Sequence, residues 1–222
     1  MASGLGLAGL MSPGAARSAI VMGEASAGGV KTYRYRILWR DSKIGYHRVR
    51  ISRDPDGLTV IEHEREMLVK LLFLTVYQFR QRSRELWVGG TLTGFRSESI
   101  ENGEDALVLG HSSGNHMVID GPEGEIVAPA DIATTESFWT ASALDKPYLV
   151  DTVKGIIVEP EVYRLDDGRW HLEHESISAD IRFDDGLMHT ADVDSDGNLV
   201  RFVPESQPIA GLDPERFRMM PD

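Results

Sequence analysis

Residues 33–52 read Y-R-Y-R-I-L-W-R-D-S-K-I-G-Y-H-R-V-R-I-S, and this stretch decides the fold. Tyr33, Tyr35, Ile37 and Trp39 fall at every second position, and most positions between them carry arginine. A period of two with aromatic and β-branched residues on one face predicts a half-buried β-strand. The connection D-S-K at 41–43 predicts a hairpin, because Asp and Ser side chains can bond the backbone of a turn. We expect later strands to lay their apolar faces against this ribbon.

Corners that favour turns recur along the rest of the chain. They are D-P-D-G at 54–57, E-N-G-E at 101–104, and Asp-Gly corners at 166–168, 184–186 and 194–197. Such corners every 10–15 residues or so, between short apolar segments, predict a meander of antiparallel strands. No longer repeat is present, which disfavours a propeller or a solenoid. The predicted fold class is all-β, mainly antiparallel, with the sheet curved into a barrel or half-barrel.

Two segments depart from this simple pattern. Residues 68–79, L-V-K-L-L-F-L-T-V-Y-Q-F, are the most apolar run and contain neither Gly nor Pro. Their aromatic and β-branched residues favour a buried strand, with an amphipathic helix as the alternative. Within 129–144, a Thr pair followed by Glu136 predicts one short helix near 135–143, with Trp139 facing inward.

Composition divides the chain into three parts. Residues 1–29 hold a short apolar run and the small residues A-S-A at 25–27, which resemble a secretory leader with its cleavage site. No basic residue precedes that run, so a disordered tail is the alternative. Residues 30–203 are expected to form a single β-rich domain, and the proline-containing stretch 204–222 a tail. We therefore expect export, to the periplasm or beyond.

Charge is distributed unevenly between the two halves of the chain. Residues 31–96 carry 14 Lys+Arg against 7 Asp+Glu, whereas residues 97–222 carry 8 against 27. The favoured explanation is complementary faces on neighbouring strands, such as Glu62, Glu64 and Glu66 opposite the arginines of the first hairpin. The alternative is a basic face for an anionic ligand or lipid head group. The net charge of −12 argues against nucleic acid as a partner.

The composition also excludes some chemistry and some topologies. Cysteine is absent, so there is no disulfide, thiolate metal site or cysteine nucleophile. No run approaches the roughly eighteen apolar residues of a transmembrane helix.

Three motifs resemble an uncharacterised group of bacterial β-rich proteins, mostly exported, known as domains of unknown function. They are Y-R-I-L-W-R-D-S-K-I-G-Y-H at 35–47, T-T-E-S-F-W-T at 134–140 preceding L-V-D-T-V-K-G at 149–155, and A-D-I-R-F-D-D-G-L at 179–187 with D-S-D-G-N-L-V-R-F at 194–202. The resemblance covers about residues 30–203. It implies an antiparallel sheet curved into a barrel or half-barrel, and it implies no activity.

Aromatic residues give the main prediction of a ligand site. If the sheet curves without closing, its concave face would carry aromatic side chains and hold an apolar ligand, as β-barrels do. Ordinary core packing is the alternative role for the same side chains. The predicted ligand-binding residues are Tyr35, Trp39, Tyr77, Trp87, Phe95 and Trp139.

A calcium site is a weaker candidate. Asp192, Asp194 and Asp196, with Asn198 close behind, match the first half of a calcium loop. Val203 stands where an EF-hand needs a bidentate Glu, so a complete EF-hand is excluded. An acidic turn is the favoured interpretation, and no other cofactor is predicted.

One motif suggests an enzyme. Residues 110–114, G-H-S-S-G, match the G-x-S-x-G pattern of serine hydrolases, with Ser112 as the nucleophile. That chemistry requires a strand-to-helix turn, whereas the following residues predict a second strand and therefore a hairpin loop. The histidines are scattered and favour surface positions over a zinc or copper site.

The preferred hypothesis is an exported, non-enzymatic protein that binds a lipid or other apolar small molecule in a curved β-sheet. The alternative is a structural or interaction protein that docks a protein partner through an edge strand or its acidic surface. A filled core with a large exposed apolar patch would favour this alternative.

Overall fold

The hairpin predicted at residues 33–52 is present in the computed structural model, which describes residues 29–166, 168–175, 177–195 and 197–205. Its strands are β1 (Val30–Trp39) and β2 (Ser42–Arg53), paired antiparallel with Tyr35 opposite His47. Position 45 on β2 has to be glycine, because a Cβ there would lie 1.9 Å from the Glu66 carbonyl oxygen on the neighbouring strand. Any larger residue would push the two strands apart.

Eleven further strands complete the same sheet. Those after the first hairpin are β3 (Leu58–Leu71), β4 (Leu74–Val88), β5 (Thr91–Glu101), β6 (Glu104–Ser113), β7 (His116–Gly121) and β8 (Gly124–Pro129). Those near the C-terminus are β12 (Glu161–Arg164), β13 (Arg169–His174), β14 (Ile177–Asp184), β15 (Leu187–Ser195) and β16 (Asn198–Pro204). Pairing is antiparallel throughout, as the Asp-Gly corners predict.

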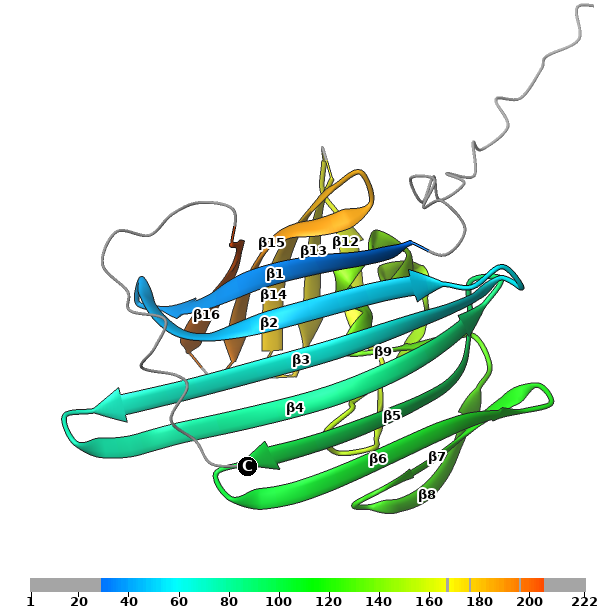
Figure 1. Cartoon of the computed structure of the whole chain (residues 1–222), viewed down its shortest axis with the longest axis horizontal. Helices are drawn as coiled ribbons and strands as arrows, with labels where there is room; N and C mark the ends of the chain where they lie inside the picture. The colour runs from blue at the N-terminus through cyan, green and yellow to red at the C-terminus, as the bar shows by residue number, and fades with distance from the viewer. Residues whose placement is uncertain (1–28, 167, 176, 196, 206–222) are drawn as a thin grey trace, which may run out of the picture.

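The order of strands places the beginning of the domain in the middle of the sheet. It runs β12-β13-β14-β15-β16-β1-β2-β3-β4-β5-β6-β7-β8, so β1 pairs with both β2 and β16. The sheet curves strongly, and β12–β16 lie behind β1–β3 in Figure 1. Within the described residues β8 and β12 remain unpaired edges, so the all-β half-barrel prediction is confirmed with an open sheet.

The segment between β8 and β12 lies against the concave side of this sheet. It contains β9 (Ile132–Thr134), β10 (Tyr148–Val150) and β11 (Ile157–Val158), with β9 and β10 parallel. The short helix predicted near 135–143 is two 3₁₀ turns, η1 (Ser137–Trp139) and η2 (Ala141–Asp145).

Two apolar clusters form the core. The larger one joins β1–β3 to β13–β15 through η1 and η2, and it includes Tyr35, Trp139 and Phe183. The smaller one lies under β5–β8 and is centred on Phe95 and Met117. The inner segment therefore separates two packed regions and contributes side chains to both.

The most apolar run of the sequence forms a hairpin instead of the single buried strand that its residues predict. Residues 68–79 divide between β3 and β4, with a turn at Leu72 and Phe73. Leu72 adopts a φ of 56°, a conformation usually left to Gly or Asn. The prediction of a single buried strand was wrong because the turn lacks the residues that normally mark one.

The predicted leader, residues 1–29, and the predicted tail, residues 204–222, fall outside the described residues except for Gly29, Pro204 and Glu205. None of the helices in the described part of the chain has the length and apolar content needed to cross a membrane.

Candidate functional site

A cavity of about 320 Å³ lies inside the curve of the sheet. One wall comes from the inner segment, with Phe138 and Trp139 from η1 and Leu149 from β10. The opposite wall is formed by alternate residues of the C-terminal strands: Leu172, Ile177, Ala179, Ile181, Met188, Ala191, Val193 and Phe202. The cavity is at the lower end of the roughly 300–1,000 Å³ usual for ligand pockets, so its size suits a small molecule.

Small residues on the C-terminal strands leave this space open. Ala179 on β14 and Ala191 on β15 both line the cavity, and Ile181 lies opposite Ala191 across the strand pair. Successive side chains of a strand point to opposite faces, so the pattern A-D-I at 179–181 and A-D-V at 191–193 turns the aspartates away from the cavity. A larger side chain at either alanine would fill part of the space.

The end of the cavity next to β2 and β3 is polar. His47, Arg65 and Glu136 line it, and all three belong to a cluster on the concave face. Arg65 Nη2 donates to Glu136 Oε1 at 2.8 Å and to Gln81 Oε1 at 2.6 Å. His47 Nε2 lies 3.3 Å from His63 Nδ1 and 3.8 Å from Glu136 Oε2. An apolar pocket therefore ends on buried groups that can form hydrogen bonds.

Behind this cluster lies a second buried acid, Glu85 on β4. Its carboxylate accepts hydrogen bonds from Thr134, from Ser137 Oγ at 3.0 Å and from Trp87 Nε1 at 2.8 Å. His63 Nε2 lies 3.7 Å from Glu85 Oε1. These contacts attach the inner segment to β4 and fix where η1 begins.

Burial controls the charge of these groups. It lowers the pKa of His47 well below its usual value, an effect increased by His63 and Arg65, and it lowers the pKa of His63 to about 3. Burial also raises the pKa of Glu85 to about 7, although three hydrogen bonds oppose that rise. Burial raises the pKa of Glu136, an effect that the Arg65 guanidinium opposes. Both imidazoles are therefore neutral near pH 7.

Only one of the six predicted ligand-binding aromatics lines the cavity, and it is Trp139. Tyr35 is buried in the larger cluster, where its hydroxyl donates to the Met188 carbonyl oxygen at 2.7 Å. Phe95 belongs to the smaller cluster, and Trp87 packs against both. Trp39 stacks with Arg40 at the end of β1, and Tyr77 lies on β4 near the β3–β4 turn. A ligand role for these five stays a prediction.

The predicted calcium loop comprises the last residues of β15 and the turn into β16. Asp192 is paired with Arg201, at 2.7 Å between Oδ1 and Nε, and Asp194 Oδ1 accepts from the Gly197 amide at 2.8 Å. Asp196 lies outside the described residues, and Asn198 begins β16. The two described aspartates thus make the contacts expected of an acidic turn, and the metal site stays a prediction.

Ser112 lies on the exposed end of β6, two residues before the turn of the β6–β7 hairpin. The strand-to-helix turn required by the G-x-S-x-G motif does not occur there, since β6 pairs directly with β7. The hairpin loop that the sequence predicted is confirmed.

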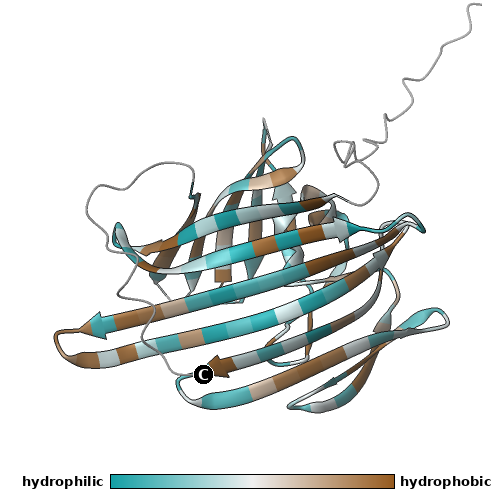
Figure 2. Cartoon of the chain, in the orientation of Figure 1, coloured by the Kyte–Doolittle hydropathy of each residue, from teal (hydrophilic) through white to brown (hydrophobic). Residues whose placement is uncertain are grey.

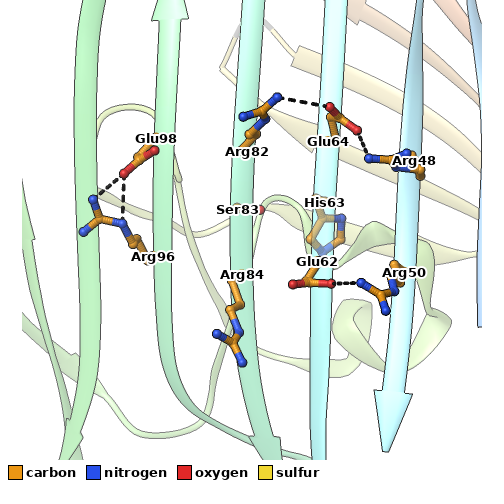
Figure 3. Close-up of a pocket in the computed structure, with 10 residues that line it drawn as sticks. All are labelled: Arg48, Arg50, Glu62, His63, Glu64, Arg82, Ser83, Arg84, Arg96 and Glu98. Carbon is orange, nitrogen blue, oxygen red and sulfur yellow. Dashed lines mark hydrogen bonds and ion pairs between the residues drawn. The ribbon is translucent and has the colours of Figure 1, made fainter. Parts of the chain in front are cut away.

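The predicted pairing of charges between strands is also confirmed, on the outer face of β2–β5. Figure 3 shows Arg48 and Arg82 both reaching Glu64, and Arg50 reaching Glu62 at 3.1 Å. Arginine and glutamate alternate across a shallow depression on this face, which explains part of the uneven charge in the sequence. Such exposed pairs contribute only about 0–1 kcal/mol each, so they mainly keep this face hydrated.

Sequence reasoning missed the polar cluster. Its signal was present, because His63 and Arg65 share a strand face with Ile61 and Met67. A polar residue at an inward position of a strand is unusual enough to mark a site. What the sequence could not show is that Glu136, 71 residues further on, meets Arg65.

Comparisons with known proteins agree with this architecture. A family model described as a domain of unknown function, DUF6134, matches residues 35–205, and the chain belongs to this family. A crystal structure of a beta-barrel-like protein of another domain of unknown function, DUF1849, from Brucella abortus is similar with a TM-score of 0.54. That likeness covers 80% of this chain and 96% of the other at 9% identity, and it shows the fold alone. A search of curated proteins gave no match.

Proposed function

We propose that this protein binds a small, mainly apolar molecule carrying one polar group in the cavity of its half-barrel, and that it acts by binding rather than by catalysis. The cavity itself is the observation that supports this function. Its walls are apolar on two sides, and one end presents His47, Arg65 and Glu136. Further polar residues also line it: Thr135, Asp151, Lys154, His174 and Glu175. An apolar body would lie against Trp139 and Met188, with the polar group toward Arg65.

Physical chemistry supports an apolar ligand in this position. A pocket lined by aliphatic and aromatic side chains holds water poorly, so an apolar molecule that displaces it gains free energy. Each buried CH₂ of the ligand is worth about 0.8 kcal/mol. The few polar groups at one end would fix the orientation of the ligand, as in other small-molecule sites. A lipid or fatty-acid-like compound has this division between an apolar body and one polar end.

The proposal is tested by filling the cavity. Ala191→Leu places a larger side chain into the space and should weaken binding of an apolar fluorescent probe such as phenylnaphthylamine by at least tenfold. Ala128→Leu is the matched control, because Ala128 is equally buried but belongs to the smaller cluster. Each substitution overpacks its site at a cost of about 1–3 kcal/mol, so circular dichroism must show that both variants fold. Equal binding by wild type and Ala191→Leu would show that the probe binds elsewhere.

Export of the protein is part of the same proposal. The resemblance of residues 1–29 to a secretory leader supports export. Fractionation of cells that express the full chain would place the protein in the periplasm or medium if the proposal holds.

A further inference from the structure

Three ligand atoms converge at the polar end of the cavity. We propose that His47 Nε2, His63 Nδ1 and Glu136 Oε2 bind a divalent transition-metal ion, with zinc the best fit. The three residues are buried, and their candidate ligand atoms all lie within 4.8 Å of one another. Two imidazoles and one carboxylate are a donor set that suits zinc, which usually takes four tetrahedral ligands.

The spacing of the two histidines fits a metal ion between them. Zinc–nitrogen bonds are about 2.0–2.1 Å, so two ligands of a tetrahedral ion lie about 3.4 Å apart. His47 Nε2 and His63 Nδ1 are separated by 3.3 Å. Glu136 Oε2 is 3.8 Å from His47 Nε2 and would need to approach by only a few tenths of an ångström. Side-chain adjustment alone can therefore close the site.

Glu136 Oε2 supplies independent support for a cation at this position. This oxygen is buried and has no hydrogen-bond partner, although Arg65 holds the other oxygen of the same carboxylate. Leaving a buried carboxylate oxygen without a partner costs free energy. A cation at the centre of the three atoms would satisfy it.

One outer contact has the direction expected of a metal-bound histidine, although it is longer than a hydrogen bond. A histidine that ligates a metal usually donates its other ring N–H to a carboxylate or carbonyl. His63 directs Nε2 toward Glu85 Oε1 at 3.7 Å, and this nitrogen has no hydrogen-bond partner either. Glu85 would orient the ring and add negative charge near the ion.

Arg65 acts against the binding of a cation. Its guanidinium lies 2.8 Å from Glu136 Oε1 and occupies that oxygen. Glu136 would therefore be a monodentate ligand, and the nearby positive charge would reduce metal affinity compared with a site lacking it. His47 and Glu136 line the cavity, so the fourth coordination position would face it.

The test uses untagged full-length protein treated with a chelator and titrated with zinc chloride in a calorimeter. We expect one zinc ion per chain, and a tetrahedral cobalt(II) absorption spectrum when cobalt replaces zinc. His47→Gln and Glu136→Gln should each weaken zinc binding by at least about 100-fold, the upper end of what loss of an outer-shell partner costs.

His174→Gln is the matched control, since His174 lines the cavity but lies outside the cluster. It should bind zinc as wild type does. Absence of stoichiometric zinc binding by wild type would overturn the proposal, and so would full binding by both His47→Gln and Glu136→Gln. None of these measurements depends on the organic ligand, so their failure is distinct from failure of the proposed function.

A second inference concerns the β3–β4 turn, which carries the most exposed apolar side chains of the described residues. Leu71, Leu72, Phe73 and Leu74 are 66%, 88%, 99% and 72% exposed. Figure 2 shows this turn as a hydrophobic end on an otherwise mixed strand pair. Monomeric soluble proteins rarely expose such a contiguous group without an interaction to cover it.

The turn also projects beyond both neighbouring strands. Pairing of β2 with β3 ends at Gly45 and Met67, and pairing of β4 with β5 ends at Phe79 and Glu101. Residues 68–78 therefore form a two-stranded ribbon that extends past the rest of the sheet in Figure 1. A ribbon of two strands is only marginally stable in water by itself.

We infer that this ribbon inserts its turn into the surface of a lipid bilayer. The most exposed apolar side chains gather at the tip of the ribbon, on the pair Leu71 and Leu74 and on the turn between them, and a flat protein surface would cover only one side of this tip. Hydrocarbon would surround all of them. Lys70 is the only charged residue between 68 and 78, and its long stem can direct the ammonium group to the lipid head groups.

Backbone groups limit the depth of insertion. Between Leu68 and Tyr77 the outer edges of the ribbon make no ladder bonds to β2 or β5, and hydrocarbon cannot satisfy backbone N–H and C=O groups at such edges. Only the turn should enter, to the depth of about 5–10 Å typical of interfacial segments. The net charge of −12 gives no attraction to anionic lipids, so apolar contact has to supply the binding.

Flotation with phosphatidylcholine vesicles tests this inference. Wild type should float with the vesicles, and Leu72→Ser/Phe73→Ser should reduce the bound fraction at least tenfold. Leu107→Ser/Val127→Ser is the matched control, because it removes two exposed apolar residues from β6 and β8. It should float as wild type does.

Two outcomes would overturn membrane insertion. One is a wild-type protein that stays with the unbound fraction. The other is a wild-type dimer in solution that Leu72→Ser/Phe73→Ser converts to monomer, which would show that a second copy of the chain covers the turn.

Discussion

Single residues on the concave face combine burial with polarity. Tyr35 and Arg65 show the two ways in which this sheet accommodates a polar atom inside. Tyr35 buries its ring in the larger cluster, and its hydroxyl donates a hydrogen bond to the carbonyl oxygen of Met188. Arg65 pairs with a buried acid, Glu136, and also bonds Gln81. Each has a partner that is distant in sequence: Tyr35 joins β1 to β15 within the curved sheet, and Arg65 joins β3 to the inner segment.

Tyr35→Phe should change the response of stability to alkaline pH. Burial raises the pKa of Tyr35 from 10 to about 12, with a contribution from Tyr33. The unfolded chain loses this proton first, so the stabilisation is complete below pH 10 and falls as pH rises toward 12. Urea unfolding should show Tyr35→Phe about 1 kcal/mol less stable than wild type at pH 7. This difference in the free energy of unfolding should become smaller above pH 10. A difference in the free energy of unfolding that stays constant with pH would contradict this role of Tyr35.

Arg65→Ala should be strongly destabilising. It removes the partner of Glu136, whose side chain is 2% exposed, and leaves a buried charge without compensation. Breaking such a pair costs about 3–5 kcal/mol, whereas replacing both members is much less harmful. We therefore expect Arg65→Met/Glu136→Gln to recover much of the loss in denaturant unfolding. A double variant no more stable than Arg65→Ala would show that the ion pair is not the cause.

Single elements differ in how directly the sequence defines them. The β1–β2 and Asp-Gly hairpins follow from period-two patterns and turn residues, and both could be predicted. The inner segment depends instead on contacts with the large sheet. Its Thr134 and Ser137 hydroxyls bond Glu85 on β4, 49 and 52 residues away. Its strands are two or three residues long, too short to give a pattern in the sequence.

Gly155→Ala should test how the inner segment is held. Gly155 has a φ of 75°, and a Cβ there would lie 2.9 Å from the Gly121 Cα at the end of β7. Gly114 has a φ of 61° with open space around it, so Gly114→Ala isolates the conformational cost of about 1 kcal/mol. We expect Gly155→Ala to lower the thermal midpoint clearly more than Gly114→Ala does. Equal shifts in the thermal midpoint would mean that the close approach of Gly155 to Gly121 is unimportant for stability.

At the scale of the whole molecule, the curvature of the sheet and the position of the cavity arise together. β1 pairs with β16, and the concave face then encloses the inner segment. Antiparallel class and curvature were predictable from the spacing of turns and the family resemblance. The cavity was not predictable, because Ala179 and Ala191 line it from one side and η1 lines it from another. Aromatic residues were a poor guide, since most of them fill the two core clusters.

The position of the β3–β4 turn in the whole sheet explains why the prediction for residues 68–79 was wrong. Hydrophobic residues normally indicate burial, and this run is more apolar than any other. Here the turn at Leu72 and Phe73 carries those residues beyond the sheet instead of into it. That outcome depends on where pairing with the neighbouring strands ends, at Gly45 of β2 and Glu101 of β5.

A crystal structure determined under xenon pressure tests the central claim most directly, because xenon enters apolar cavities without needing a specific ligand. We predict xenon in the interior of the half-barrel, in contact with Ala179, Met188 and Ala191. An interior filled by side chains, or a chain of ordered water in place of xenon, would contradict the proposal that this cavity binds an apolar molecule.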